Sequence, residues 1–178
     1  MDTIVIPFSK KKILLKSLMS LAFVAMGVLL IAVIANDQTR WPPLLIQAIG
    51  GLNILFFGVA AIAYLRLLFV KKPGIVLNDE GIINNSSYLS TGLLKWDDIN
   101  ALRIEQVKST KFLIVYLNDP WQIIKVASGF KRWLMMGNMR RYNTPISISA
   151  TVLDCSFEEL EKWVTERFSK SIAQNQPA

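Results

Sequence analysis

Two long stretches of apolar residues dominate the N-terminal part of the chain, at positions 17–35 and 44–65. Neither stretch contains a charged residue, and only scattered Ser, Gly, Gln and Asn positions interrupt them. In a helix that rises about 1.5 Å per residue, these stretches reach roughly 28 and 33 Å, close to the ~30 Å hydrocarbon core of a bilayer. The pattern predicts two membrane-spanning helices.

Two other interpretations fit this pattern less well. A soluble chain of 178 residues has too little protein to surround two helices that are apolar on every side. A cleaved signal sequence would use the basic lead at residues 10–16, but such signals have an apolar core of about 7 to 15 residues and no second span behind them.

The segment between the two stretches, residues 36–43, predicts a tight reversal. Asn36 and Asp37 are suited to end the first helix, and Pro42 with Pro43 suits the start of the second, where a missing N–H costs little. Trp41 stands where an interfacial aromatic residue is expected. The two spans are therefore predicted to form an antiparallel hairpin.

Small residues predict how the hairpin packs. They recur seven positions apart, as Ala25 and Ala32 on the first span and as Gly51 and Gly58 on the second. Such spacing returns to one helix face and allows close approach of two backbones. Asn53 is expected to form a hydrogen bond with Ser20 or with the backbone; a homo-oligomer contact through the hairpin is the alternative for this residue.

The charges are distributed unevenly. Residues 1–72 contain eight Lys or Arg and two Asp, whereas residues 73–178 contain twelve Lys or Arg and eleven Asp or Glu. Most of the excess flanks the spans, so the positive-inside rule predicts a multi-pass protein of the cytoplasmic (inner) membrane with both termini in the cytoplasm. The nearly neutral remainder, residues 73–178, argues against a nucleic-acid partner.

Beyond residue 73 the pattern changes to short β-like runs separated by Asn, Asp, Ser and Gly. These runs predict seven antiparallel strands, at residues 74–77, 81–85, 93–96, 101–107, 111–117, 122–126 and 145–149. Residues 4–8, ahead of the first span, form a further short β-like run. This run is either an extra strand on an edge of the sheet or a tail at the membrane interface.

The last predicted element is a helix over about residues 156–170. Ser156 and Glu159 have the spacing of a capping box, in which each side chain bonds the other's backbone N–H. Phe157, Leu160, Val164 and Phe168 then fall on one face, with Trp163 beside them. Cys155, just before the cap, is expected to be a small buried residue. The domain division is thus an N-terminal segment with hairpin at 1–72 and a β domain at 73–178.

Seven strands closed by a C-terminal helix follow the order of a pleckstrin-homology (PH)-like barrel. Together with the two N-terminal spans, the segments at residues 73–82, 94–99, 143–148 and 153–160 resemble bacterial membrane proteins that have a cytoplasmic PH-like domain. The resemblance covers the whole chain and implies a fold class, a membrane hairpin plus a mainly-β PH-like barrel, and a location. It implies no reaction.

One segment has an unusual composition. Residues 120–153 contain five basic residues and no acidic residue before Asp154. Within it, the apolar run that begins at Trp133 is framed by two basic pairs; the candidate binding residues are Lys131, Arg132, Trp133, Arg140 and Arg141. Basic clusters around an aromatic residue suit an anionic lipid surface or a protein partner. The alternative is a helix that packs Phe130 and Trp133 inward and leaves its charges in solvent.

The composition offers little for catalysis. There is no histidine, and the one cysteine excludes an internal disulfide and a Cys-rich zinc site. No phosphate-binding glycine loop or nucleophile elbow is found, and the adjacent Asp97 and Asp98 would point to opposite faces of a strand. We therefore expect no enzyme, no metal and no cofactor. The expected function is a membrane-anchored interaction module that docks on the inner leaflet or on a protein partner; an immunity protein against a membrane-acting toxin is the alternative.

Overall fold

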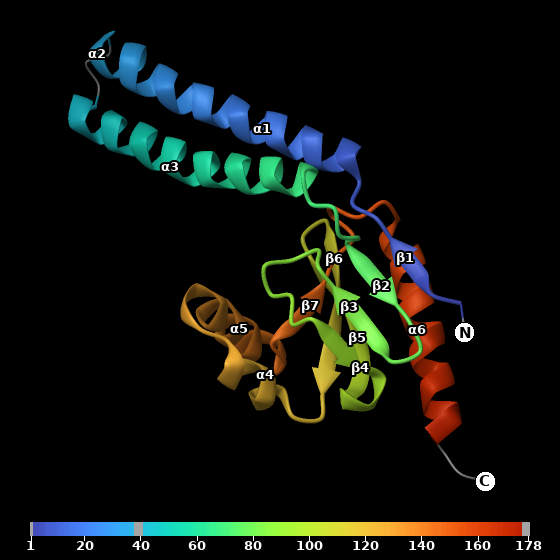
Figure 1. Ribbon diagram of the computed structural model, residues 1–178. Helices are drawn as coiled ribbons and strands as arrows, with labels where there is room; N and C mark the ends of the chain where they lie inside the picture. Colours follow the sequence, from blue (N-terminus) through green and yellow to red (C-terminus); the bar gives the residue numbers. More distant parts are fainter. Residues whose placement is uncertain (1, 38–40, 176–178) are drawn as a thin grey trace. The chain divides into compact units, whose positions relative to one another are not determined.

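The computed structural model describes residues 2–37 and 41–175 and divides into two compact units. One unit is a helical hairpin over residues 10–71, and the other is a β unit made of residues 2–9 and 72–175 (Figure 1). The hairpin unit ends one residue before the boundary predicted at residue 72. Residues 2–9, which the sequence places with the hairpin, belong to the β unit.

Two long helices build the hairpin. The first runs through α1 (Lys10–Leu29), a π-helical segment η1 (Leu30–Ile34) and the short α2 (Ala35–Asp37), and the second is α3 (Pro43–Leu68). Pro42 is the residue before the first turn of α3 and Pro43 lies within that turn, as predicted. Both helices are long and apolar enough to cross a membrane.

The two helices approach closely at Gly27 and Gly50. A Cβ atom on Gly50 would lie 2.7 Å from the Cγ1 atom of Ile31 and 2.9 Å from the carbonyl oxygen of Gly27. The predicted contact glycines were Gly51 and Gly58, and this prediction is wrong, because a Cβ atom at either position meets nothing within 4 Å. The seven-residue spacing of small residues does not by itself show which face of α3 meets α1.

The predicted bond between Asn53 and Ser20 is also absent from the described residues. The Ser20 hydroxyl donates instead to the carbonyl oxygen of Lys16, 2.9 Å away on its own helix. The Asn53 Oδ1 atom is buried beside Gly27 and has no hydrogen-bond partner among the described residues. The hydroxyl is satisfied locally because a serine inside a helix can bond the carbonyl four residues earlier.

The described part of the β unit contains seven strands in two antiparallel sheets. They are β1 (Ile4–Ile6), β2 (Ile75–Leu77), β3 (Gly81–Asn84), β4 (Leu93–Lys95), β5 (Ile99–Val107), β6 (Thr110–Leu117) and β7 (Ile146–Ile148). One sheet has the order β1-β2-β3-β4 and the other β5-β6-β7. The expected closed barrel is therefore wrong, since β4 and β5 end separate sheets, with the short 3₁₀ turn η2 (Trp96–Asp98) between them.

The N-terminal β-like run is a strand. β1 pairs antiparallel with β2, with Ile4 opposite Leu77 and Ile6 opposite Ile75. The residues that follow β1 are also bonded to the β unit, because the Ser9 N–H donates to the Val152 carbonyl at 2.9 Å. Ile6 is only 2% exposed and belongs to the main core. The strand interpretation of residues 4–8 is thus confirmed for the part that forms β1.

One predicted strand is a helix. Residues 122–126 lie in α4 (Pro120–Val126), which begins where the Asp119 carboxylate accepts the N–H of Trp121 at 3.0 Å. In the sequence, Asp119 followed by Pro120 indicates a turn between the strands predicted at 111–117 and 122–126. An Asp cap followed by Pro in the first turn equally starts a helix, and a short apolar run does not distinguish the two.

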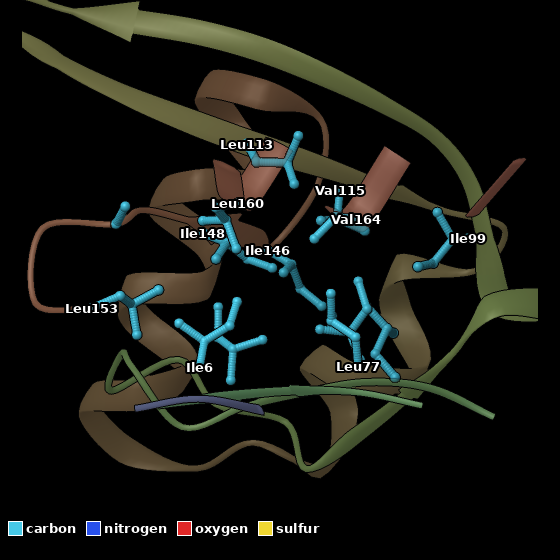
Figure 2. Packing of buried hydrophobic residues seen from close by; sticks show 14 of the residues in the cluster. Ile6, Leu77, Ile99, Leu113, Val115, Ile146, Ile148, Leu153, Leu160 and Val164 are labelled. Atoms are coloured by element: carbon cyan, nitrogen blue, oxygen red, sulfur yellow. The ribbon is translucent and has the colours of Figure 1, made fainter. Parts of the chain in front are cut away.

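The main core lies between the two sheets and α6 (Phe157–Asn175), as the labelled side chains in Figure 2 show. Leu160 and Val164 of α6 are fully buried there, and Phe157, Trp163 and Phe168 pack against the cluster. The capping box is confirmed: the Ser156 N–H donates to Glu159 at 2.7 Å, and the Glu159 N–H donates back to the Ser156 hydroxyl at 3.1 Å. Cys155 is buried, as expected.

An exposed ion pair joins α6 to β6 and predicts a small pH effect on stability. The Lys111 Nζ atom lies 2.7 Å from Glu158 Oε1, and this hydrogen bond raises the pKa of Lys111 above 10.5 and lowers that of Glu158 below 4.5. The stabilisation is therefore present between pH 4.5 and 10.5. It is lost as the pH falls through the lowered pKa of Glu158, and also as it rises through the raised pKa of Lys111.

The Glu158→Gln variant should consequently unfold at a slightly lower temperature than the wild type at neutral pH. The difference should be small, because both side chains are exposed, and it should disappear below the pKa of Glu158 and above that of Lys111. Thermal unfolding followed by circular dichroism across this pH range measures it. A difference that stays constant at every pH would show that the ion pair is not its cause.

Candidate functional site

The basic segment singled out in the sequence forms a helical lobe. It consists of α4 and α5 (Gly129–Tyr142), which lie together beside the sheets in Figure 1. A second, smaller core holds this lobe: Ile124, Ala127 and Met135 are buried, and Leu89 from the β3–β4 loop packs against them. Two helices and one loop therefore share a core separate from the main one.

Polar bonds fix the orientation of α5. The Asn138 side-chain amide donates to the carbonyl of Pro145 at 3.1 Å, which ties the helix to the start of β7. Lys131 Nζ donates to the Ser90 carbonyl, which ties it to the β3–β4 loop. The helix ends at Asn143, whose left-handed backbone, with a φ of 58°, lets its N–H bond the Met139 carbonyl. The outer face of α5 is thus held in one orientation.

That outer face exposes large aromatic side chains. Phe130 is 61% and Trp133 is 68% exposed, and their rings stack with centroids 5.5 Å apart. The alternative in which both residues pack inward is wrong. Met135, on the opposite side of α5, is the residue that enters the small core.

A third aromatic residue completes the cluster from outside the helix. Tyr88, in the β3–β4 loop, is 67% exposed, and its ring centroid lies 6.0 Å from that of Phe130. Sequence reasoning missed it, because it stands 42 positions before Phe130 in a run of Asn and Ser that indicates only a turn. The fold brings it to α5 through the packing of the neighbouring Leu89.

The exposed aromatic and basic residues follow one stripe of α5. Because a helix turns about 100° per residue, positions 130, 133, 137, 140 and 141 share a face. We call this the aromatic–basic face; it consists of Phe130, Trp133, Gly137, Arg140 and Arg141. Its aromatic residues lie in the first turns and its two arginines in the last turn, where positive charge also favours the helix dipole.

The predicted site residues divide into three groups. Trp133, Arg140 and Arg141 come together on the aromatic–basic face, whereas Arg132 is exposed but lies away from that face, about 200° around the helix from Phe130. Lys131 points toward the loop and bonds Ser90, so it is a structural residue in this conformation. Lys125, at the end of α4, is exposed.

The guanidinium groups of this lobe carry uncompensated charge. Within residues 2–37 and 41–175, no carboxylate forms an ion pair with Arg132, Arg140 or Arg141. Arg141 instead lies over the ring of Tyr142, with 5.4 Å between the guanidinium carbon and the ring centroid. Exposed rings beside unpaired guanidinium groups can contact an apolar layer and anionic groups at the same time.

An open cleft of about 440 Å³ lies on another part of the β unit. It is lined by Asp79, Glu80, Lys95, Trp96, Asp97, Ser171 and Gln174. The Trp96 indole N–H donates a hydrogen bond to the Asn78 carbonyl at 2.9 Å, and Asp79 lies 3.6 Å from the guanidinium of Arg167. Among the described residues, no cluster of three or more His, Cys, Asp or Glu side chains is arranged to hold a metal ion.

Comparisons of the chain with protein-family models, with curated proteins and with solved structures find no match. The geometry of the lobe is therefore the main guide to function.

Proposed function

We propose that the protein is a non-enzymatic, membrane-anchored module whose aromatic–basic face docks on an anionic lipid surface. The observation that carries the proposal is the stacked, exposed pair Phe130 and Trp133 on the same stripe of α5 as Arg140 and Arg141. Trp and Phe favour the interfacial region of a bilayer, and arginines favour anionic headgroups by about 1 kcal/mol each.

The hairpin supplies the anchor in this proposal. Apolar side chains cover the outer surfaces of both helices; Leu44 is 76% and Phe56 is 70% exposed. Such surfaces are stable in lipid and costly in water. The basic residues that flank the spans favour a cytoplasmic β unit with both termini on the same side, in an inner membrane.

Short connections keep the β unit near the bilayer. Three residues separate β1 from α1, and six separate α3 from β2. Fully extended, these links span at most roughly 10 and 20 Å. These short links support a lipid surface, rather than a distant partner, as the occupant of the docking face.

The expectation of a PH-like domain has a coarser structural support. Two antiparallel sheets of four and three strands followed by a C-terminal helix are compatible with such a domain, although the sheets do not close and α4 and α5 stand between β6 and β7. We keep the PH-like assignment and the bacterial membrane family as part of the proposal. A fold of this kind does not determine function. The support for lipid docking is the exposed aromatic–basic face of α5.

The test uses the full chain in lipid nanodiscs, because β1 lies ahead of the hairpin and a fragment that begins at residue 73 would lack it. A fluorophore is attached to Gly137→Cys, a position on the aromatic–basic face where an added Cβ meets nothing within 4 Å. Quenching by lipids labelled in the headgroup region reports docking. We expect stronger quenching with phosphatidylglycerol present than with phosphatidylcholine alone.

Reversal of Arg140 and Arg141 to Glu should lower the docked fraction about tenfold or more, given the headgroup attraction of each arginine. The matched control reverses two exposed cations elsewhere on the β unit, Lys162 and Lys170, and should leave quenching unchanged. Equal quenching in both lipids, or equal losses in both double variants, would overturn the docking proposal.

A further inference from the structure

The outer edge of β5 is an unpaired strand of nine residues. β5 ends the three-stranded sheet, and it pairs with β6 on one side only. Among the described residues no backbone group of 100–107 bonds any other strand or loop on the outer side. Most of its side chains are exposed, and Ile104, an apolar residue, is 45% exposed. A long free edge of this kind is a template for a further strand.

The turn after β5 determines which backbone groups face outward. Val107 and Thr110 pair across the two-residue turn at Lys108 and Ser109. Such a turn closes on a pair that exchanges hydrogen bonds, and the direction of these groups alternates along an antiparallel ladder. Counting back from Val107, the N–H and C=O groups of Gln106, Ile104 and Leu102 are directed to the open edge.

The charges on β5 are complementary to a second copy of the same strand. Arg103 and Glu105 lie on one face of the strand, with Arg103 Nε 3.1 Å from Glu105 Oε1. If two copies of β5 run antiparallel about a two-fold axis at Ile104, Arg103 lies directly opposite Glu105 of the second copy, and the reverse pair forms too. Opposite charges in such directly facing positions stabilise a sheet.

The neighbouring registers are disfavoured. An axis at Arg103 would place two arginines opposite each other, and an axis at Glu105 would do the same with two glutamates; like charges in directly opposed positions are destabilising. The axis at Ile104 also covers the exposed Ile104 with its own copy. With this axis, Ile104 forms a hydrogen-bonded pair with Ile104 of the second copy, and Leu102 forms one with Gln106 of the second copy. These are the residues whose backbone groups are directed outward.

We propose that the protein forms a two-fold symmetric dimer in which β5 of one copy pairs antiparallel with β5 of a second copy about Ile104, joining two three-stranded sheets into one of six strands. The interface is isologous, so it closes at two copies and leaves no open edge on either β5. The aromatic–basic face of α5 takes no part in this contact.

Disulfide trapping tests the register on the full chain in liposomes. Copies with Ala101→Cys and copies with Val107→Cys, distinguished by tags of different mass, are reconstituted together and oxidised. The proposed axis places these two positions opposite each other in a non-hydrogen-bonded pair, where Cα atoms are about 4.5 Å apart. We expect efficient crosslinking between the two kinds of copy. The matched control, Asn100→Cys with Val107→Cys, is one position out of register and should crosslink poorly.

Charge reversal then tests the pairing itself. With Arg103→Glu in both kinds of copy, or Glu105→Arg in both, the yield should fall about tenfold, because two like-charged pairs replace two ion pairs. Mixing copies of Arg103→Glu with copies of Glu105→Arg restores both ion pairs and should restore the yield, which also shows that each variant is folded. Equal yields for the matched and out-of-register cysteines, unchanged yields in the single reversals, or failure of the mixture would each overturn the proposal.

Discussion

Replacing Gly50 with leucine should destabilise the hairpin by about 2–3 kcal/mol, the cost expected for forcing extra atoms into a well-packed contact. The reason is the closeness of α1: a Cβ atom on Gly50 would already lie 2.9 Å from the Gly27 carbonyl oxygen, which belongs to a helix backbone and cannot move alone. Titration of the full chain in mixed micelles with sodium dodecyl sulfate measures the effect. Energy transfer between dyes on Lys11→Cys and Lys71→Cys follows separation of the helices.

Gly51→Leu is the matched control, one residue along the same helix. A Cβ atom there meets nothing within 4 Å, so we expect no loss of hairpin stability. Leucine also has a higher helix propensity than glycine, by about 0.8 kcal/mol, which favours the variant. If Gly51→Leu were the more damaging change, the helices would pack through the Gly51 and Gly58 face that the sequence spacing first indicated.

This pair of glycines shows what a sequence can reveal about a helix contact. Composition and length are properties of one segment, and they correctly predicted two long apolar helices; residues 38–40 of the predicted reversal lie outside the described residues. Which face of α3 meets α1 depends on both helices together. Gly50 is matched to Gly27 across the contact, and neither the period nor the size of the residues on α3 alone could distinguish it from Gly51.

The β unit shows the same limit at longer range. Six of the seven predicted strands are present, because alternation and turn residues are local signals. The seventh prediction failed at residues 122–126, where Asp119 caps a helix. The seventh strand of the β unit is β1, which precedes the hairpin in the sequence and completes the four-stranded sheet. Only its pairing with β2 distinguishes a strand from an interfacial tail at these residues.

The candidate site was predictable in composition and not in geometry. Basic residues without acidic neighbours marked the segment, but the burial of Met135 decided that Phe130 and Trp133 face outward. Tyr88 joins them through a loop that no local pattern connects to α5. An interaction surface built by two distant segments becomes visible only when their shared core is known.

Ile6→Ala should cost the β unit about 2–5 kcal/mol, the range for emptying a buried isoleucine site. Ile6 is 2% exposed and packs in the core with Ile75 and Leu77 of β2, the strand that follows the hairpin in the sequence. Its loss removes apolar contacts and leaves a cavity that β1 cannot close, because the strand is held by its pairing with β2 and by the Ser9–Val152 hydrogen bond just after it. Urea unfolding of the full chain in micelles, followed by near-ultraviolet circular dichroism, measures the free energy of unfolding.

Val5→Ala is the control on the same strand. Val5 is 56% exposed, and substitution at such a position changes stability by about 0.5 kcal/mol or less. Equal costs at both positions would mean that β1 contributes no core residue, and rapid hydrogen exchange at the Ile6 amide would then be expected as well. The predicted difference makes the first strand an essential part of the β unit, because the hairpin is inserted in the sequence between β1 and β2, and these two strands pair with each other.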